Sequence, residues 1–407
     1  MRLIVGLHHL ELGGSQLNAL DLAVTMRDSG HDVAVFGNFT DRPGPVADLA
    51  RDAGLPVIAA KHPAVRLART MPARPVLSRA LAKAAHDFRA DLLHVYEFSV
   101  ALDAFYGVHL RRGVPVVTTI YGMRVPRWMP RYGELIVGTA QLVDEAAAFR
   151  ARPTLIEPPV NTDSDDPATV DGQAFRAEHG IAADEILLTV VSRLEPDMKA
   201  EGILRTIRAV GLLADPRLRF VVVGDGPSYA DVAAEAARVN ATAGRPVVVM
   251  AGSMDDPRPA YAGADLMVGM GGSALRSMAF GRPLVVLGIK GFFLSAGAET
   301  EDYFLRAGFY GIGTGDVDPA PLAADLRKLV DDPELRAERG RWGRRLVLDR
   351  FSLKTAAQTL SGVYERALAE PATPARRFTE GARVAGHKAV ADLLSDGARR
   401  RVRRLLG

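Results

Sequence analysis

Short apolar runs alternate with amphipathic helical patterns along this 407-residue chain, and this alternation limits the folds open to it more than any other feature. In the first part of the chain, the apolar runs that predict buried strands cover residues 3–7, 32–36, 56–59, 91–96 and 115–120. The helical patterns between them cover residues 15–29, 78–88 and 100–111. Strands and helices that alternate in this way are typical of an open parallel sheet covered by helices.

A second alternation follows residues 156–161, whose paired prolines we interpret as a stiff hinge. Its predicted strands cover residues 186–191, 219–223, 247–250, 265–268 and 284–287, with helices at 200–213 and 229–240. The chain is also too long for one ordinary core, which favours two domains. The predicted fold class is therefore α/β, with two tandem Rossmann-like, doubly wound parallel-sheet lobes that face a cleft, followed by C-terminal helices.

The predicted boundaries follow from the same patterns. Residues 1–160 form the first lobe and residues 161–350 the second. A long amphipathic segment at residues 352–370 is expected to return to the first lobe. Residues 371–407 are predicted to form a basic helical tail.

Composition excludes several classes of protein. The chain has no cysteine, so it has no disulfide, no thiolate chemistry and no cysteine-based metal site. Its longest apolar runs have the length of strands, and residues 1–7 enter a strand directly, so we expect a cytoplasmic protein. The net charge of +3 is too small to suggest nucleic-acid binding. The arginine-rich end at residues 399–406 could contact a membrane surface weakly, or it could be a solvated helix.

A glycine-rich loop separates the strand predicted at residues 265–268 from a helix expected to open near Ser273. Bare amides at the positive end of a helix suit a phosphate. We expect Arg276 in the first turn, where a cation opposes the helix dipole unless an anion lies in front of it. The alternative is a tight turn whose glycines only relieve steric strain. The residues predicted to contact a phosphate are Gly271, Gly272, Ser273, Ala274 and Arg276.

Two cations, Arg193 and Lys199, follow the first predicted strand of the second lobe. Cations that converge beside the start of a helix suit a diphosphate. The alternative is an exposed pair neutralised by Glu195 and Asp197. Gly224 follows the next strand, in a turn where the ring or ribose of a ligand could approach the backbone, or in an ordinary turn.

Ligands of parallel α/β sheets bind beyond the carboxyl ends of the strands. In the first lobe, this places several polar and glycine residues on one rim: His8, His9, Gly13, Gly14, Glu97, Tyr121 and Arg124. We nominate His9, Glu11 and Glu97 as candidate acids or bases. A histidine at the end of a strand is more often a hydrogen-bonded structural residue.

Several motifs occur in one order along residues 1–370. They are an early GG, DLLHVYE, PVVTTIYG, EPPVNTD, VSRLEPDMK, RFVVVGDGP, YAGADLMV, LRSMAFGRPLVV and RFSLKTAAQTLSGVYERAL. In this order the chain resembles the glycosyltransferases of family four, which have the GT-B fold. The resemblance implies a sugar transferase that uses a nucleoside diphosphate sugar and a small-molecule or lipid-linked acceptor, without a metal.

The resemblance also implies roles for individual residues. Arg193 and Lys199 match the Arg and Lys that bind the donor diphosphate. Gly14 matches the glycine, preceded here by Gly13, whose backbone faces that diphosphate. The donor's nucleobase is expected at the turn formed by Gly252, Ser253 and Met254.

The chain departs from the family pattern where two glutamates eight positions apart are usual. Arg276 occupies the second position, and the apolar Val268 lies eight residues before it. Tyr121 replaces a histidine that is common after the VVTT strand. Two alternatives stay open: a nucleotide-sugar 2-epimerase of the same fold, and a non-catalytic nucleotide-binding partner protein. The absence of the glutamates counts against the epimerase, and the presence of both Arg193 and Lys199 counts against loss of function.

Overall fold

The computed structural model describes residues 1–62, 72–122 and 124–405, with side chains up to residue 392. The side chains of the arginine-rich run at 399–406 lie outside the described residues. The chain divides into two compact units, each described here by itself. Unit 1 comprises Met1–Pro158 and Leu353–Gly407, and unit 2 comprises Pro159–Ser352.

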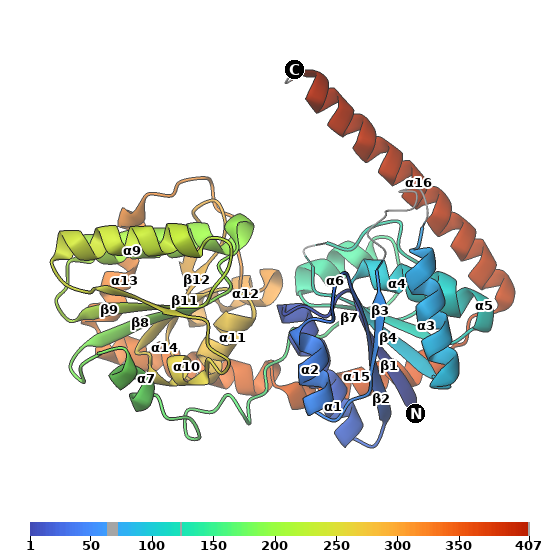
Figure 1. Cartoon of the computed structure of the whole chain (residues 1–407), viewed down its shortest axis with the longest axis horizontal. Coiled ribbons are helices and arrows are strands. Elements are labelled where there is room, and N and C mark those ends of the chain that lie inside the picture. Colours follow the sequence, from blue (N-terminus) through green and yellow to red (C-terminus); the bar gives the residue numbers. More distant parts are fainter. Residues whose placement is uncertain (63–71, 123, 406–407) are drawn as a thin grey trace. The chain divides into compact units, whose positions relative to one another are not determined.

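Unit 1 contains a seven-stranded parallel sheet with the order β3-β2-β1-β4-β5-β6-β7 (Figure 1). Its strands are β1 Arg2–Leu7, β2 Asp32–Phe39, β3 Val57–Lys61, β4 Leu92–Tyr96, β5 Val116–Ile120, β6 Leu135–Val137 and β7 Pro153–Leu155. Its α-helices are α1 Gly14–Asp28, α2 Pro45–Asp52, α3 Pro75–Asp87, α4 Phe98–Ala104, α5 Leu110–Arg112, α6 Ala140–Ala147, α15 Leu353–Ala369 and α16 Pro374–Leu405. A π-helical turn, η1 Phe105–His109, joins α4 to α5.

Helices cover both faces of the sheet in unit 1. Along β1, Leu3, Val5 and Leu7 pack on one side with α1, α2 and α15. Ile4 packs on the other side with α3, α4 and α6. Successive side chains of a strand point to opposite faces, so a strand that is buried on both sides reads as a continuous apolar run.

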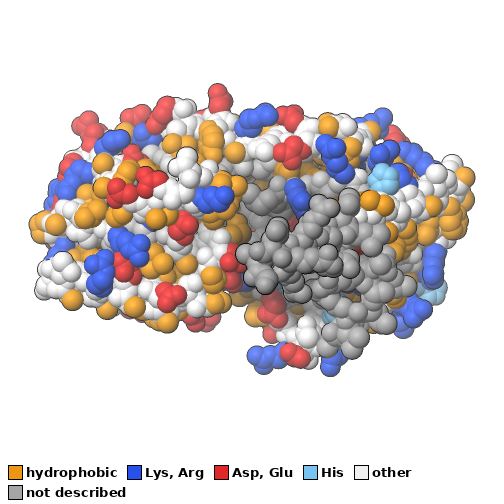
Figure 2. All heavy atoms as spheres, turned by 90° about the horizontal axis from the view of Figure 1, so that it is seen from above, with side chains coloured by type: hydrophobic (Ala, Val, Ile, Leu, Met, Phe, Trp, Pro, Cys, Tyr) orange, Lys and Arg blue, Asp and Glu red, His pale blue; other side chains and the backbone are white. Residues whose placement is uncertain are grey.

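Unit 2 contains a six-stranded sheet with the order β10-β9-β8-β11-β12-β13. The strands are β8 Ile186–Val191, β9 Leu218–Val223, β10 Val248–Gly252, β11 Leu266–Gly269, β12 Leu284–Leu287 and the antiparallel β13 Phe293–Ser295. The helices are α7 Gln173–Glu178, α8 Glu201–Leu213, α9 Tyr229–Ala243, α10 Arg258–Gly263, α11 Gly272–Ala279, α12 Glu301–Ala307, α13 Pro319–Asp331 and α14 Pro333–Arg350, with short helical turns η2 Pro196–Ala200 and η3 Ala298–Thr300. On the surface of unit 2 seen in Figure 2, positive and negative side chains are interspersed.

The strand orders locate one switch point in each sheet. In unit 1 the order reverses at β1 and β4, and in unit 2 it reverses at β8 and β11. The loops that leave two such strands diverge to opposite sides of the sheet, which opens a crevice at their carboxyl ends. The loops that follow these four strands therefore line the crevices in which ligands of such sheets bind.

The long helix α15 belongs to unit 1. The hydroxyl of its Tyr364 lies 2.7 Å from Nδ1 of His94 on β4, and both residues are buried. The Nε2 atom of His94 lies 2.7 Å from the hydroxyl of Thr119 on β5. Buried polar groups that satisfy one another in this way fix the register of the elements that carry them. Within the described residues, no helix is long and apolar enough to cross a membrane.

Candidate active site

In unit 2, the loop after β8 lies against the glycine turn after β9. The amide of Leu194 donates to the carbonyl of Asp225 at 2.9 Å, and the amide of Ser228 donates to the carbonyl of Leu194 at 3.0 Å. Gly224 has φ +139, and a Cβ there would overlap the carbonyl oxygen of Ser192. Only glycine permits this backbone approach, so the turn holds in place the loop that carries Arg193.

Arg193 and Lys199 both lie in this segment at the switch point. Arg193 is exposed and forms an ion pair with Glu195. Lys199 lies in η2, the helical turn that begins α8, and not in a loop before the helix as its sequence position suggested. Burial lowers the pKa of the Lys199 ammonium, the nearby Arg193 lowers it further, and Glu195 opposes both effects. Two cations close enough to repel each other favour an anion beside them.

The end of β10 joins the same edge of the sheet. The carbonyl of Gly252 accepts a bond from the amide of Gly224 at 2.7 Å, and a Cβ on Gly252, which has φ +73, would meet open space. Ser253 is exposed, and Met254 packs against a buried cluster that contains Val223. The three residues of the predicted nucleobase turn therefore follow a strand at the edge of this sheet, next to the glycine turn.

The glycine-rich loop after β11 leads directly into α11. The amide of Gly271, which has φ +57, donates to the carbonyl of Phe309 at 2.7 Å. The hydroxyl of Tyr261 donates to that of Ser273 at 3.1 Å. The amide of Leu275 donates to the carbonyl of Gly271, which is the first hydrogen bond of the helix. The amides of Gly272, Ser273 and Ala274 precede it and are therefore available at the start of α11.

The prediction that Arg276 lies in the first turn of this helix is wrong. Because α11 begins at Gly272 and ends at Ala279, Arg276 falls in its last turn, where a cation is favourable to the helix dipole. Its Nε atom lies 3.4 Å from Oδ2 of Asp165, a carboxylate whose side chain is only 3% exposed. The buried Asp165 therefore supplies a structural partner for Arg276 that requires no phosphate.

Asp165 lies in a turn that is shaped by Asn161 and Asp166, whose side chains accept hydrogen bonds from nearby amides. Burial raises the pKa of the Asp165 carboxyl, and Arg276 and Arg258 lower it. No sequence signal links Asp165 to Arg276, since the two are far apart in the chain.

In unit 1, the loop after β1 gathers two histidines around Gln16, a buried residue in the first turn of α1. The side-chain nitrogen of Gln16 lies 3.1 Å from Nε2 of His8 and 3.0 Å from Nε2 of His9. The amide of Glu11 donates to Nδ1 of His9 at 3.2 Å, while the Glu11 side chain is exposed. Burial, with His9 and Arg74 adding to it, lowers the pKa of His8 to about 4. Sequence reasoning missed Gln16, whose only signal was its position just after the paired glycines.

The paired glycines before α1 have different environments. A Cβ on Gly13 would meet the amide end of the flexible Gln16 side chain, which would have to shift. A Cβ on Gly14 would meet nothing within 4 Å. Gly14 therefore leaves open space beside the start of α1.

Glu97 follows β4 at the switch point of unit 1 and has an unusual backbone. Its φ of +73 and ψ of +153 lie in a region that is occupied almost solely by glycine. Its side chain accepts a bond from the amide of Tyr121 at 3.1 Å, and its own amide donates to Thr119 at 2.8 Å. Burial raises the pKa of Glu97, partly offset by bonds from the amides of Tyr121 and Gly122. Strained residues with a raised pKa cluster at functional sites, which favours Glu97 over Glu11 as a candidate base.

The structure thus assembles the predicted residues into two groups, one in each unit. Arg193, Lys199, the Gly252 turn and the glycine loop lie at the carboxyl ends of the parallel strands of unit 2. His9 and Glu97 lie at the corresponding ends of β1 and β4 in unit 1. Within the ranges that the structure describes, no cluster of three or more histidine or acidic side chains could hold a metal ion.

Two protein families match this chain. Residues 13–155 match the family described as "Glycosyl transferase 4-like domain", and residues 185–332 match "Glycosyl transferases group 1". Two doubly wound sheets that are each matched by a glycosyltransferase family define the chain as a glycosyltransferase of GT-B fold. More particularly, it belongs to the group 1 glycosyltransferases, the family-four type that the motifs resemble.

Relatives and solved structures agree with this assignment. The chain is 30% identical to the 2-deoxystreptamine glucosyltransferase of Streptomyces kanamyceticus over 41% of this chain and 43% of that protein. It is also 30% identical to a D-inositol 3-phosphate glycosyltransferase of Streptomyces avermitilis over 58% of this chain and 52% of that one. The matches thus span about half the length of these curated relatives. The structure of Anabaena HepE in complex with UDP-glucose superposes with a TM-score of 0.68 at 19% identity, over 90% of this chain and 100% of HepE.

Proposed function

We propose that this protein transfers a sugar from a nucleoside diphosphate sugar to a small-molecule or lipid-linked acceptor. The observation that carries the proposal is the pair Arg193 and Lys199, held at the switch point of unit 2 close enough for the charge of Arg193 to lower the pKa of Lys199. A diphosphate bound beside these two cations would offset their mutual repulsion with its own negative charge.

In this proposal, unit 2 binds the donor. Arg193 and Lys199 hold the diphosphate, assisted by the amides of Gly272, Ser273 and Ala274. Gly224 and the turn formed by Gly252, Ser253 and Met254 lie against the nucleoside. Arg276 pairs with Asp165, so its main role is to hold the glycine-rich loop and α11 in place. It contacts the diphosphate less directly than its sequence position suggested.

The proposed reaction replaces one bond at the anomeric carbon of the donor sugar. An acceptor hydroxyl forms a new bond to that carbon, and the bond between the carbon and the diphosphate breaks. The two cations stabilise the negative charge that develops on the leaving diphosphate, which is the largest demand that such a reaction makes. Glu97 is the proposed group that takes the acceptor proton, because its raised pKa keeps it poised to accept one.

We also propose that the transfer needs no metal and that the protein acts in the cytoplasm, with a weak membrane contact through its basic tail. The match to two glycosyltransferase families favours transfer over the 2-epimerase alternative. A catalytic role is favoured over a non-catalytic one because Glu97 carries backbone strain of the kind that clusters at functional sites.

Product analysis by mass spectrometry tests this proposal. UDP-glucose is the first donor to supply, since HepE was solved with it, and 2-deoxystreptamine and D-inositol 3-phosphate are the first acceptors, since they stand in the names of the relatives. We expect a glycosylated acceptor in the presence of EDTA, from a panel that extends to other nucleotide sugars. Conversion of a donor into its 2-epimer would instead support the epimerase.

A further inference from the structure

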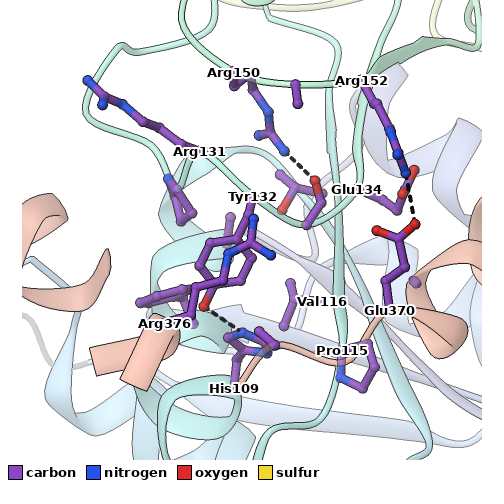
Figure 3. A pocket seen from close by; sticks show the side chains of 18 of the residues that line it. His109, Pro115, Val116, Arg131, Tyr132, Glu134, Arg150, Arg152, Glu370 and Arg376 are labelled. Atoms are coloured by element: carbon purple, nitrogen blue, oxygen red, sulfur yellow. Dashed lines mark hydrogen bonds and ion pairs between the residues drawn. The ribbon is translucent and has the colours of Figure 1, made fainter. Parts of the chain in front are cut away.

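Unit 1 contains a cavity that the proposed reaction does not use. It is a cavity of about 240 Å³, formed just before β5, β6 and β7 and closed on one side by the segment that joins α15 to α16 (Figure 3). The candidate active-site residues lie at the carboxyl ends of parallel strands, and this cavity lies at the opposite, amino ends. A five-residue strand is about 16 Å long, so the two places are well separated.

Arginine dominates the charge of this cavity. Five arginines and two glutamates line it. Each glutamate already has a partner, since Arg366 lies 3.1 Å from Glu134 and Arg152 lies 2.9 Å from Glu370. The remaining arginines leave the cavity with a surplus of positive charge.

Arg150 is buried beside the cavity, where Glu134 and Glu380 favour its charge without forming an ion pair with it in the described chain. Its side chain is only 7% exposed, and among the residues that the structure describes it forms no ion pair. One guanidinium nitrogen donates to the carbonyl of Gly133, but the buried Nε atom has no hydrogen-bond partner within the described chain. Burial lowers the pKa of Arg150 to about 10. A buried cation with an unsatisfied donor is costly unless an anion compensates for it.

A second arginine faces the same cavity from α16. The guanidinium carbon of Arg376 lies 4.4 Å from the centre of the Tyr132 ring, and Figure 3 shows it reaching toward the cavity from the side opposite Arg150. The ring itself is fixed by His109, whose Nδ1 donates to the carbonyl of Val114 at 2.8 Å. The neutral Nε2 then accepts from the Tyr132 hydroxyl at 3.1 Å. The wall opposite Arg150 is therefore a rigid aromatic ring with a cation on it.

We propose that this cavity binds a small organic phosphate, with the phosphate held by Arg150 and Arg376 and the organic part against Tyr132 and Phe105. The planar guanidinium matches the oxygens of a phosphate, and two arginines that form no ion pair in the described chain leave room for that dianion. The cavity volume suits a ligand of a few carbon atoms. This inference goes beyond the proposed sugar transfer and does not depend on it.

Calorimetric titration of the full chain with glycerol 3-phosphate at low salt tests the proposal, with glycerol as the uncharged control. We expect saturable binding that weakens at least tenfold in Arg150→Gln and in Arg376→Gln. Arg51→Gln is the matched control, because it removes an exposed arginine of the same unit that pairs with Asp48 on α2. Its affinity should equal that of the unchanged protein.

Arg376→Gln decides the result if Arg150→Gln fails to fold, because Arg376 is exposed and its loss leaves the core intact. A lipid headgroup presents the same phosphate, so a second arm measures sedimentation with phosphatidylcholine vesicles that contain phosphatidic acid. Vesicle binding that falls in Arg376→Gln identifies a lipid as the source, and a loss confined to glycerol 3-phosphate identifies a soluble ligand. No saturable binding in either arm, or equal binding by both pocket variants and the unchanged protein, overturns the proposal.

Discussion

At the scale of single residues, the most informative is Glu97. Its backbone conformation favours glycine, whereas the proposed reaction requires its carboxylate. The φ of +73 is unfavourable for any residue other than glycine, yet a glutamate stands there. Residues in such conformations cost on the order of 1–3 kcal/mol and persist where function requires the side chain. The stability of unit 1 and its reaction therefore favour different residues at position 97.

Replacing Glu97 with glycine separates the effect of the residue on stability from its effect on the reaction. We expect Glu97→Gly to leave the melting temperature unchanged or higher, because relief of strain offsets the lost bond to Tyr121. Sugar transfer should fall by roughly 10²–10⁴-fold, as for the loss of a general base. Glu97→Gln keeps the strain and should lose activity without gaining stability. Full activity in Glu97→Gly would remove the residue from the catalytic site.

Arg276 and Asp165 should behave as one pair. Arg276→Gln leaves a buried carboxylate without its partner, so we expect a loss of about 1–3 kcal/mol in the free energy of unfolding. Arg276→Glu should cost more, because it brings a second negative charge to Asp165. In a double-mutant cycle measured by denaturant unfolding, Arg276→Gln should cost much less in an Asp165→Asn background. Strictly additive costs would show that the 3.4 Å contact is not energetically coupled.

At the scale of elements, the glycine turn after β9 is the part that positions Arg193. Gly224→Ala should lower both stability and nucleotide affinity, because the new Cβ would displace Ser192 and the loop beyond it. Gly180→Ala is the control, since Gly180 has φ +64 but nothing within 4 Å of its Cβ position. That variant should lose only the roughly 1 kcal/mol typical of a strained alanine. Equal nucleotide affinity in the two variants, measured by titration calorimetry, would contradict this role for the turn.

The attachment of α15 to the sheet should depend on pH. Burial lowers the pKa of His94 to about 3, so it stays neutral in the folded protein while the unfolded chain protonates below its usual value of 6.5. Its contribution to stability is complete above pH 6.5 and is lost as the pH falls toward 3, by about 1.4 kcal/mol per pH unit. His8, with its pKa lowered to about 4, acts in the same direction.

Denaturant unfolding between pH 7 and pH 4 measures this dependence. We expect the free energy of unfolding to fall as the pH falls, and to fall less steeply in His94→Asn because the contribution of His94 is gone. An unchanged slope in that variant would show that His94 does not carry the effect.

At the scale of the whole molecule, the alternating pattern was enough to predict both sheets and the long helices. It failed for β6, β7 and β13, which have three residues each and are too short to show a period. It also failed for the short helices α2, α6, α7, α10 and α12. In the site, the cations at Arg193 and Lys199 could be found because a strand end and a helix start flank them in sequence. The Arg276–Asp165 pair, the contacts of Gln16 and the strain at Glu97 depend on tertiary packing, which no local pattern records.

The central claim is that Arg193 and Lys199 bind the diphosphate of a nucleotide sugar. Titration calorimetry with UDP at low salt, comparing the unchanged protein with Arg193→Gln and Lys199→Gln, tests it most directly. Losing a bond to a charged group costs about 1.5–3 kcal/mol, so each variant should bind roughly 10–100-fold more weakly, with its melting temperature preserved. If UDP is not the nucleotide, the same comparison is made with the diphosphate that the unchanged protein binds. Affinities equal to that of the unchanged protein in both variants would contradict the account.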